Sequence, residues 1–287
     1  MKIAFDPDVL RYLSITDMVH KISEMGFEYI EQSPHPQILP FYKHPKASKE
    51  IIAEYKKALK ETGVTISSMI PIYNWSGPDE ERRQAAVKNW KRAIEIAVEL
   101  NVNVMNTELA GDPHQPIICE EMFYKSMEEL LPIFEREDIR LDIQSHPYDF
   151  CENGDETVDI VKSFRSDKVK YLYCAAHTFF YDNGVGDVAG MLDYAGDDLS
   201  HVIIADTLNQ TKNCRYIVNP PGVSATVHQH VGLGEGDVDF DAFFKKLREM
   251  KFAQREDTIA SVSLFGFPEK ITYQAPEILA RIKKELL

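Results

Sequence analysis

Short apolar segments recur along the chain, and each is followed by a stretch in which apolar residues have helical spacing. The segments begin roughly 30 to 40 residues apart, apart from a longer final interval. This alternation predicts parallel strands joined by helices, and eight such strands fit a closed (β/α)8 barrel better than an open sheet. The expected strands are residues 2–6, 29–32, 65–71, 102–108, 139–145, 169–175, 201–206 and 259–265.

The expected helices have recognisable ends. Ser14 and Asp17 form a capping box at the start of the first helix, and Gly26 ends it. Ser48 begins the second helix and Gly63 ends it. Because no Pro/Gly-rich or polar tract divides the chain, we expect a single TIM barrel over residues 1–287. Further helices are expected at residues 79–100, 120–137 and 157–163, after residue 185, and at residues 239–250 and 276–287.

The connection between the seventh and eighth strands is the longest, and its surplus lies in residues 207–236. It contains His228 and His230, which run into Gly232, Gly234 and Gly236. In extended backbone, residues two apart point to the same side, so the two imidazoles are suited to joint binding of Zn, Mn or Fe. The glycines permit a close backbone approach or a positive φ. The alternative interpretation of this segment is a tight turn into the last helices.

Polar residues stand at the carboxyl end of most expected strands, which is the end that carries the active site in such barrels. For Asp6 and Asp206 the alternative is capping of the next helix. The alternative for His177 is that its ring packs in an aromatic cluster. His146, a lone histidine at the end of a strand, is more typical of a substrate-binding or supporting group than of a metal ligand. The candidates are Asp6, Glu31, Gln32, Glu108, Gln144, His146, Cys174, His177 and Asp206.

The formal charge of −14 restricts the possible partners. Nucleic-acid binding needs Lys and Arg to replace counterions, so we expect no nucleic-acid partner. No apolar stretch approaches the ~20 residues of a membrane span, and Lys2 and Asp6 interrupt the first strand, so neither a membrane nor export is expected. The four cysteines are scattered without a C-x-x-C pair, which favours free thiols and a cytoplasmic location.

Several segments together resemble the xylose-isomerase-like barrels, a superfamily of sugar isomerases, epimerases and type IV apurinic endonucleases. Residues 174–180 (CAAHTFF) resemble its Asp-x-x-His segment, and residues 230–236 (HVGLGEG) resemble its His-x-x-Leu-Gly-x-Gly segment. Residues 141–147 (LDIQSHP) resemble its fifth-strand Glu-x-His. Within the superfamily, residues 2–6 (KIAFD), 29–36 (YIEQSPHP), 75–78 (WSGP) and 216–222 (YIVNPPG) are similar to the H-type branch encoded with bacterial myo-inositol catabolic enzymes.

The chain departs from this superfamily at the usual metal site. Its isomerases hold a divalent metal with Glu, Asp, His and Glu on strands five to eight, and the matching positions here are Gln144, Cys174, Ile203 and about Ser263. Three anionic ligands are lost, so a hard Mg or Mn ion at that position is poorly neutralised.

The endonuclease branch implies a different metal site, made here of His177, His228 and His230. Three neutral imidazoles suit Zn, or Fe with an added carboxylate from Glu108 or Asp206. The sequence therefore predicts either a relocated divalent metal or none.

The resemblance implies an isomerase or epimerase that acts on a keto-inositol or related keto-sugar by removing the proton beside a carbonyl. Glu108 is the expected base, with His146 or His177 as the relay and Asp206 as a further catalytic group. Substrate-binding roles are expected for Glu31, Gln144, Cys174 and Trp75.

Three other functions remain open at this point. A dehydratase or a lyase shares the first steps on the same substrates. A catalytically degraded barrel would instead bind a sugar or a partner protein as a regulatory subunit. The acidic charge argues against the third, DNA repair. The resemblance also implies a possible homo-oligomer.

Overall fold

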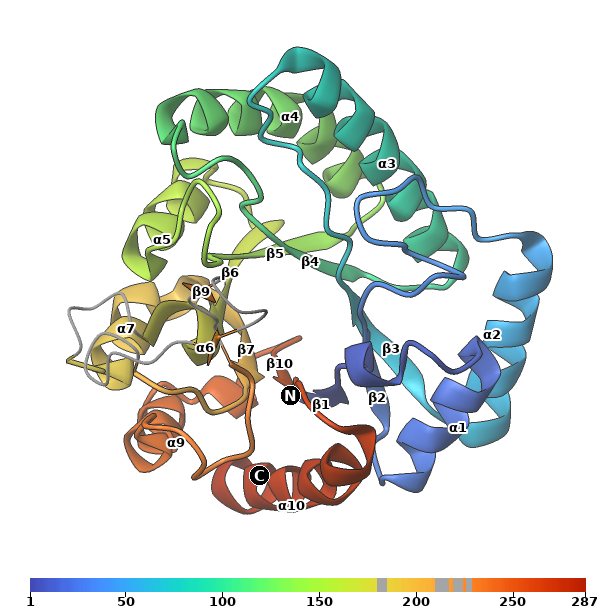
Figure 1. Ribbon diagram of the computed structural model, residues 1–287, viewed down its shortest axis with the longest axis vertical. Coiled ribbons are helices and arrows are strands. Elements are labelled where there is room, and N and C mark those ends of the chain that lie inside the picture. The colour runs from blue at the N-terminus through green and yellow to red at the C-terminus, as the bar shows by residue number, and fades with distance from the viewer. Residues whose placement is uncertain (180–184, 210–216, 219–223, 226–228) are drawn as a thin grey trace.

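The computed structural model describes residues 1–179, 185–209 and 229–287, together with the backbone of β8 (Ile217–Val218) and β9 (Ser224–Ala225). Eight parallel strands close into one barrel in the order β1-β10-β7-β6-β5-β4-β3-β2, which confirms the expected TIM barrel (Figure 1). The strands are β1 (Lys2–Phe5), β2 (Tyr29–Gln32), β3 (Thr65–Met69), β4 (Val104–Glu108), β5 (Arg140–Gln144), β6 (Val169–Cys174), β7 (Leu199–Ile204) and β10 (Ile259–Val262).

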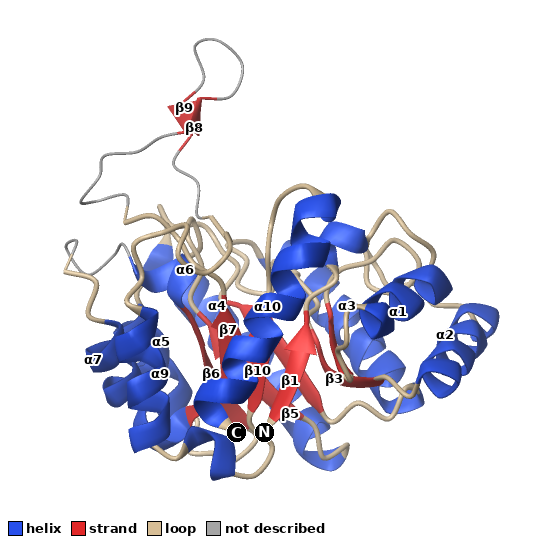
Figure 2. Ribbon diagram, turned by 90° about the horizontal axis from the view of Figure 1, so that it is seen from below, coloured by secondary structure: helices blue, strands red, loops and turns tan. Residues whose placement is uncertain are grey.

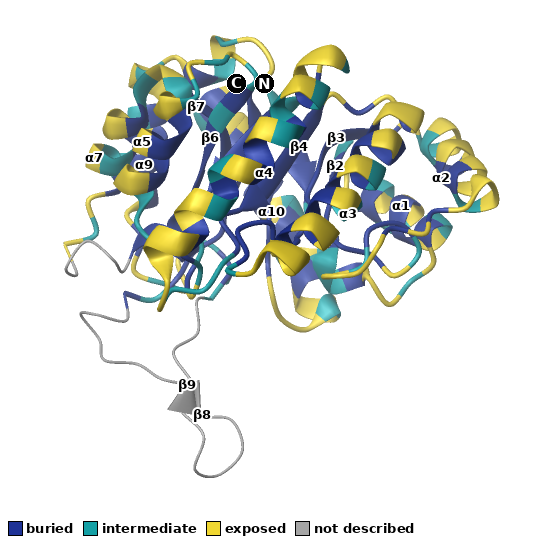
Figure 3. Cartoon of the chain, turned by 90° about the horizontal axis from the view of Figure 1, so that it is seen from above, coloured by how far each residue is buried: buried dark blue, intermediate teal, exposed yellow. Residues whose placement is uncertain are grey.

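The helices surround the barrel (Figure 1), and the side chains that they bury are mainly apolar. Exposed residues gather on the outward side of these helices, as Figure 3 shows. Burial of one face per helix against the sheet is the main source of stability in this architecture. The α-helices are α1 (Ile15–Glu24), α2 (Lys49–Thr62), α3 (Glu80–Glu99), α4 (Pro116–Arg136), α5 (Gly154–Ser163), α6 (Ala175–Thr178), α7 (Val188–Ala195), α9 (Phe240–Glu249) and α10 (Pro268–Leu286); short 3-10 helices occupy Asp8–Leu10, Gly196–Asp198 and Phe252–Gln254.

The expected helix caps are confirmed. The side chain of Ser14 accepts a hydrogen bond from the backbone N–H of Asp17, and Ser48 caps α2 in the same way. Asp79 accepts from the N–H of Arg82 at the start of α3. Such caps satisfy donors that the first helical turn leaves unpaired.

Three helices begin earlier than the sequence suggests. α5 begins at Gly154 rather than Thr157, and the other two begin at a proline. α10 begins at Pro268 rather than Pro276, and α4 begins at Pro116 rather than Glu120. A proline in the first turn is tolerated because its missing N–H has no helical partner there. Pro276 lies inside α10, where Ala275 is fully buried, so packing on the barrel overrides the cost of the internal proline.

The one-turn helix α6 was not expected. β6 ends at Cys174, and α6 follows at once, so the last residue assigned to the strand, Ala175, begins a helix instead. Four residues are too few for a periodic signal, and only their surroundings select the helical turn. The turn is important for the site because it carries His177.

The interior of the barrel contains a chain of paired charges. Arg140 binds the carboxylate of Asp142 with two hydrogen bonds of 2.7 and 2.9 Å. His201 lies between Asp142 and Glu31, at 3.5 and 3.7 Å from their carboxylate oxygens. All but Arg140 are almost completely buried, so each charge depends on its neighbour for compensation. Glu31, Asp142 and His201 therefore belong to the core of the barrel.

The two ends of the barrel differ. Figure 2 shows both chain termini at the lower end and α6 at the upper end, so the carboxyl ends of the strands lie at the top of that view.

No helix among the described residues combines the length and apolarity needed to cross a bilayer. Cys119, Cys151 and Cys174 are free and buried, while Cys214 lies outside the described residues.

A candidate metal centre in the pocket above the strands

A pocket of about 310 Å³ opens at the carboxyl ends of the strands. Its wall combines acidic, imidazole and aromatic side chains from loops that follow different strands. This is the place where barrels of this kind carry their active site. The lining residues include Asp6, Asp8, Phe41, Tyr42, Glu108, Gln144, His146, His177, Ile203, His230, Ser263 and Phe265.

Backbone carbonyls orient two histidines on one wall of this pocket. Nδ1 of His177 lies 3.1 Å from the carbonyl oxygen of Ser145, and Nδ1 of His230 lies 3.1 Å from that of Ser263. A carbonyl oxygen only accepts hydrogen bonds, so in each contact Nδ1 carries the proton and donates. In the neutral state, Nε2 of both rings therefore presents a lone pair.

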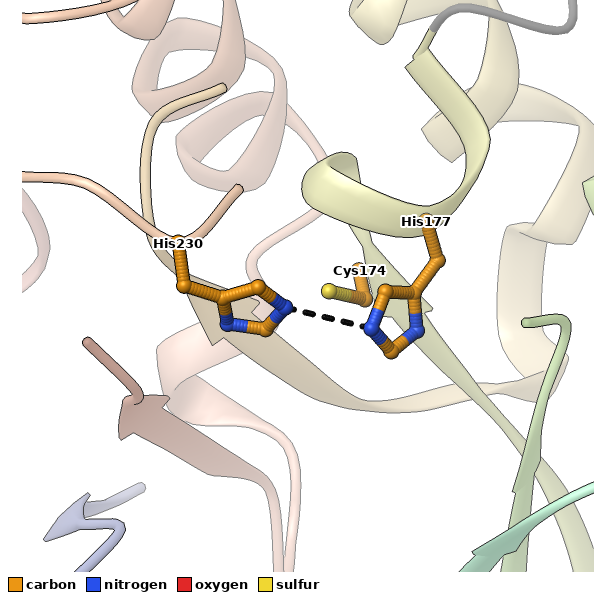
Figure 4. A group of neighbouring side chains, drawn as sticks. All are labelled: Cys174, His177 and His230. Carbon is orange, nitrogen blue, oxygen red and sulfur yellow. Dashed lines mark hydrogen bonds between the residues drawn. The ribbon is translucent and has the colours of Figure 1, made fainter. Parts of the chain in front are cut away.

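These two lone pairs point at each other. The Nε2 atoms of His177 and His230 are 3.1 Å apart, as the dashed line in Figure 4 marks. Two nitrogen lone pairs at this distance repel each other unless both nitrogens interact with a shared proton or metal ion. Cys174 lies beside them, and one donor atom from each of the three residues falls within 4.8 Å of the others.

The donor set fits a metal ion. One thiolate and two imidazoles are typical of Zn²⁺ sites, in which a second hydrogen bond fixes each ring. These residues would hold the ion as Cys174 Sγ, His177 Nε2 and His230 Nε2. His228, the other histidine expected to bind a metal, lies outside the described residues.

Asp206 anchors the loop that carries His230. Its buried carboxylate accepts hydrogen bonds from the backbone N–H groups of Thr207, Gly234 and Val238 at 2.8 to 3.1 Å. Its own backbone pairs with Val231 in both directions, at 2.9 Å. Asp206 therefore faces the loop backbone, and it is not among the residues that line the pocket. This geometry indicates a positioning role in place of the expected catalytic contact.

The same loop needs glycine where it meets Asp206. A Cβ at Gly236 would lie 2.3 Å from Oδ1 of Asp206 and 2.3 Å from the carbonyl oxygen of Thr207. Gly234 has a φ of +89°, which other residues rarely adopt. The glycine repeat is thus explained by a close backbone approach and one left-handed position.

Phe265 holds His230 from its other side. The two rings stack with centroids 4.1 Å apart at 18°, and the N–H of Phe265 donates to the carbonyl of His230 at 2.8 Å. Ser263 also contacts Nδ1 of His230 through its hydroxyl, at 3.2 Å. The ring is therefore confined by stacking and hydrogen bonds before any ligand binds.

Glu108 and His146 form a second wall, which adjoins the first because the rings of His146 and His177 are 4.7 Å apart. Nε2 of His146 lies 3.6 Å from Oε1 of Glu108, and Nδ1 lies 3.7 Å from Oδ2 of Asp149. Burial raises the pKa of Glu108 to about 8 and lowers the pKa of His146 to about 4. Near neutral pH, Glu108 is therefore a protonated acid, and His146 is an uncharged imidazole.

Asp6 is a second perturbed carboxyl in the pocket. Burial, followed by the charges of Asp8 and Glu31, raises its pKa to about 7. It accepts hydrogen bonds from Ser263 Oγ at 2.7 Å and from the N–H of Asp8 at 2.9 Å. The second bond is local to the turn after β1 and is not the helix cap considered from the sequence, because α1 is capped by Ser14; Asp6 also lines the pocket.

The four residues expected to bind substrate occupy different places. Gln144 lines the pocket, and Cys174 belongs to the histidine group. Glu31 is 1% exposed inside the barrel, where Asn106 donates to it at 2.6 Å. Burial opposes ionisation of Glu31, but the charge of His201 lowers the pKa of its carboxyl below the usual value. Glu31 is therefore a partner in the interior charge chain.

Trp75 is fully buried and also lies outside the pocket. Its ring packs on Trp90 with centroids 4.9 Å apart, and its indole N–H donates to the carbonyl of Glu108 at 3.1 Å. Trp75 thus fixes the backbone that presents Glu108 to the pocket. This placement does not favour the expected contact of Trp75 with substrate.

Sequence reasoning missed Asp149, Asp8 and Tyr42. Tyr42 and Asp8 line the pocket, and Asp149 approaches His146 from the loop after β5. All three lie beyond a strand end, in segments without periodicity. The only sequence signal for Asp8 and Asp149 is that each lies a few residues after a strand. Residues that merely cap a helix occupy similar positions, so this signal does not single out a site residue.

Comparison with solved structures supports the fold. D-psicose 3-epimerase, crystallised in the presence of D-fructose, has a TM-score of 0.76 and 15% identity, covering 100% of this chain and 99% of that one. An IOLI protein with a bound zinc atom has a TM-score of 0.69 and 19% identity, covering 99% and 96%. A probable 3-DHS dehydratase from Bacillus anthracis has a TM-score of 0.72 and 16% identity, covering 98% and 99%.

Sequence comparison gives the family assignment. No curated protein matches the chain. A family model for the xylose isomerase-like TIM barrel matches residues 19–282, which is nearly the whole chain. The structure and this match agree with the resemblance found in the sequence. The chain belongs to the xylose isomerase-like TIM barrel family.

Proposed function

We propose that the chain is a metal-dependent isomerase or epimerase of an uncharged keto-sugar or keto-inositol, and that it removes the proton beside the carbonyl. The observation that carries this proposal is the 3.1 Å approach of Nε2 of His177 to Nε2 of His230. A divalent cation held there supplies a Lewis acid for a carbonyl oxygen.

The pocket favours an uncharged substrate. Among the described residues that line it there is no Lys or Arg, while Asp6, Asp8 and Glu108 are acidic. A phosphorylated sugar would find no cationic side chain there to neutralise it. Carboxylates accept hydrogen bonds from hydroxyl groups, and Tyr42 and Phe265 offer aromatic faces to a sugar ring.

Glu108 is the proposed base. Its carboxyl lies in the pocket wall, and its raised pKa gives the ionised form a strong affinity for a substrate proton. His146 lies 3.6 Å away, but its pKa of about 4 makes it a poor acceptor of this proton, so Glu108 itself can hold the proton and return it. A proton returned to the opposite face of the substrate carbon gives an epimer, and one returned to the neighbouring carbon gives an isomer.

The similar solved structures are consistent with the proposed activity on keto-sugars. One similar structure is an epimerase of D-psicose, and another is an IOLI protein that holds a zinc atom. The short sequence segments similar to the inositol-associated branch favour keto-inositols within the class of keto-sugars.

NMR in deuterated water tests the proposal. The zinc-loaded protein is mixed in turn with keto-inositols, D-fructose and D-psicose, and loss of the signal from the proton beside the carbonyl is followed. We expect exchange with at least one of them, whether or not a net product accumulates. Absence of exchange across the panel, with zinc bound, would contradict the proposal.

Dehydration is the second candidate. Near neutral pH the protonated Glu108 can donate its proton to a departing hydroxyl group, and a probable dehydratase is among the similar structures. The same NMR spectra distinguish dehydration from isomerisation or epimerisation, because loss of water gives new vinylic or enol signals. The remaining alternative, a non-catalytic sugar-binding or regulatory barrel, predicts binding of these sugars without exchange.

A further inference from the structure

A second group of potential metal ligands lies next to the first, with the ring of His146 4.7 Å from that of His177. It consists of Glu108, His146 and Asp149, which offer one donor atom each within 4.8 Å of the others. Glu108 ends β4, and the other two residues follow β5. We propose that these three side chains form a second divalent-cation site, separate from the site of Cys174, His177 and His230.

The charges of this group call for a positive partner. Glu108 and Asp149 are both largely buried, with side chains 10% and 13% exposed. Among the described basic side chains, only the imidazole of His146 lies within 4 Å of either carboxylate. Burial raises the pKa of both carboxyls, because the ionised pair would carry negative charge that one imidazole does not compensate, which is costly away from water. A cation removes that cost.

Unpaired oxygen atoms point in the same direction. Oδ2 of Asp149 meets no hydrogen-bond donor among the described residues, although the backbone of Gly111 donates to the same carboxylate. Oε1 of Gln144 is also buried and without a donor in the described structure, and Gln144 is only 1% exposed. Gln144 stands beside Glu108 in the sheet register, and both line the pocket. Buried oxygens in such positions are typical of a cation site.

The two groups differ in the ions they suit. Cys174, His177 and His230 supply sulfur and nitrogen, which favour Zn²⁺. Glu108 and Asp149 supply oxygen, and His146 supplies nitrogen, a combination that favours Mn²⁺ or Fe²⁺. The rings of His146 and His177 are 4.7 Å apart at 79°, so the two sites would be neighbours without sharing a ligand.

Metal stoichiometry tests the proposal. The full chain is stripped with a chelator, reloaded with Zn²⁺ and then Mn²⁺, freed of unbound metal and analysed for both elements. We expect two ions per wild-type chain. Asp149→Asn should lose the Mn²⁺ and keep the Zn²⁺, while His230→Ala should lose the Zn²⁺ and keep the Mn²⁺. Glu156→Gln, which changes an exposed carboxylate further along the same segment, should keep both ions.

Mn²⁺ electron paramagnetic resonance supplies an independent readout. In His230→Ala, Mn²⁺ titration should give a bound signal that Asp149→Asn weakens at least about tenfold in affinity. If the Asp149 variant fails to fold by circular dichroism, Glu108→Gln replaces it. A wild-type chain that binds one ion, or an Mn²⁺ signal unchanged by Asp149→Asn and by Glu108→Gln, would overturn the proposal.

This result is separable from the proposed function. Two bound ions without proton exchange on any keto-sugar would contradict the isomerase assignment and leave the second site in place. Proton exchange in a chain that binds only zinc would do the reverse.

Discussion

The two walls of the pocket are built differently. On one wall, backbone carbonyls and a stacked ring fix His177 and His230 with their Nε2 atoms exposed to each other. On the other, Glu108 and His146 approach each other at 3.6 Å, and burial shifts the pKa of each toward its neutral form. The first wall is preorganised to bind an ion, and the second is suited to hold or release a proton.

One pocket thereby separates ion binding from proton transfer. A histidine whose Nδ1 is committed to a carbonyl has one tautomer and one free nitrogen. A carboxyl whose pKa lies near neutrality exists in two protonation states at working pH. The following changes test the contrast, beginning with the largest expected effect.

Glu108→Gln removes the proposed base without changing its size. We expect proton exchange to fall by about 10²- to 10⁴-fold, because a positioned base contributes that much. The zinc content should not change, since Glu108 is not among the ligands on the first wall. Exchange is followed by NMR and zinc by elemental analysis. An unchanged exchange rate would remove Glu108 from the mechanism.

His230→Ala should abolish stoichiometric zinc binding and lower exchange by at least about 100-fold, because the Lewis acid is lost. The barrel should stay folded, with a loss of about 1–3 kcal/mol from the missing hydrogen bonds and stacking. Gln229→Ala, the neighbouring change, should retain the ion. Full exchange in the zinc-free His230 variant would refute the role of this wall.

Asp206→Asn tests whether the first wall depends on its loop anchor. An amide nitrogen cannot accept the N–H groups of Thr207, Gly234 and Val238, so part of the network is lost. We expect zinc affinity to fall by about 10- to 100-fold and the free energy of unfolding to fall by about 2–3 kcal/mol. Glu249→Gln, which changes an exposed carboxylate of α9, should change neither by much. A variant that loses exchange but keeps zinc affinity would restore Asp206 to a catalytic role.

Mn²⁺ added beyond the first bound ion should inhibit exchange severalfold. An ion between Glu108 and Asp149 would occupy the carboxylate that the proposed reaction needs as a base. Asp149→Asn should relieve this inhibition, measured as the ratio of the rates of that variant with and without added Mn²⁺. Inhibition that persists equally in Asp149→Asn would place the inhibitory ion elsewhere.

The pH dependence of stability should report the second wall. The folded-state pKa of Glu108 is raised to about 8 and that of Asp6 to about 7, both above unfolded values near 4. Between these values the folded chain binds more protons than the unfolded chain, so stability falls as pH rises from about 4.5 to 8. In metal-free protein, Glu108→Gln should flatten this slope, measured by urea unfolding at several pH values. An unchanged slope would show that Glu108 is ionised when folded.

Much of the fold is predictable from local patterns. Strands and capped helices follow from apolar periodicity and from residues such as Ser14, Ser48 and Gly63, because these signals act over a few neighbouring residues. The starts of α4 and α10 were misplaced because a proline can begin a helix or lie within one, and packing selects between the two.

The site was predictable only in part. The order of the strands already predicts that four of the site's side chains reach the same end of the barrel, since parallel strands bring their carboxyl ends together. They are Glu108, Gln144, His146 and His177. Tertiary structure decided which way each group faces. Asp206 turned to the loop backbone, Glu31 joined the charges inside the barrel, and His177 met His230. The physical reason is that hydrogen-bond partners from distant segments, which no local pattern encodes, set the direction of a buried polar side chain.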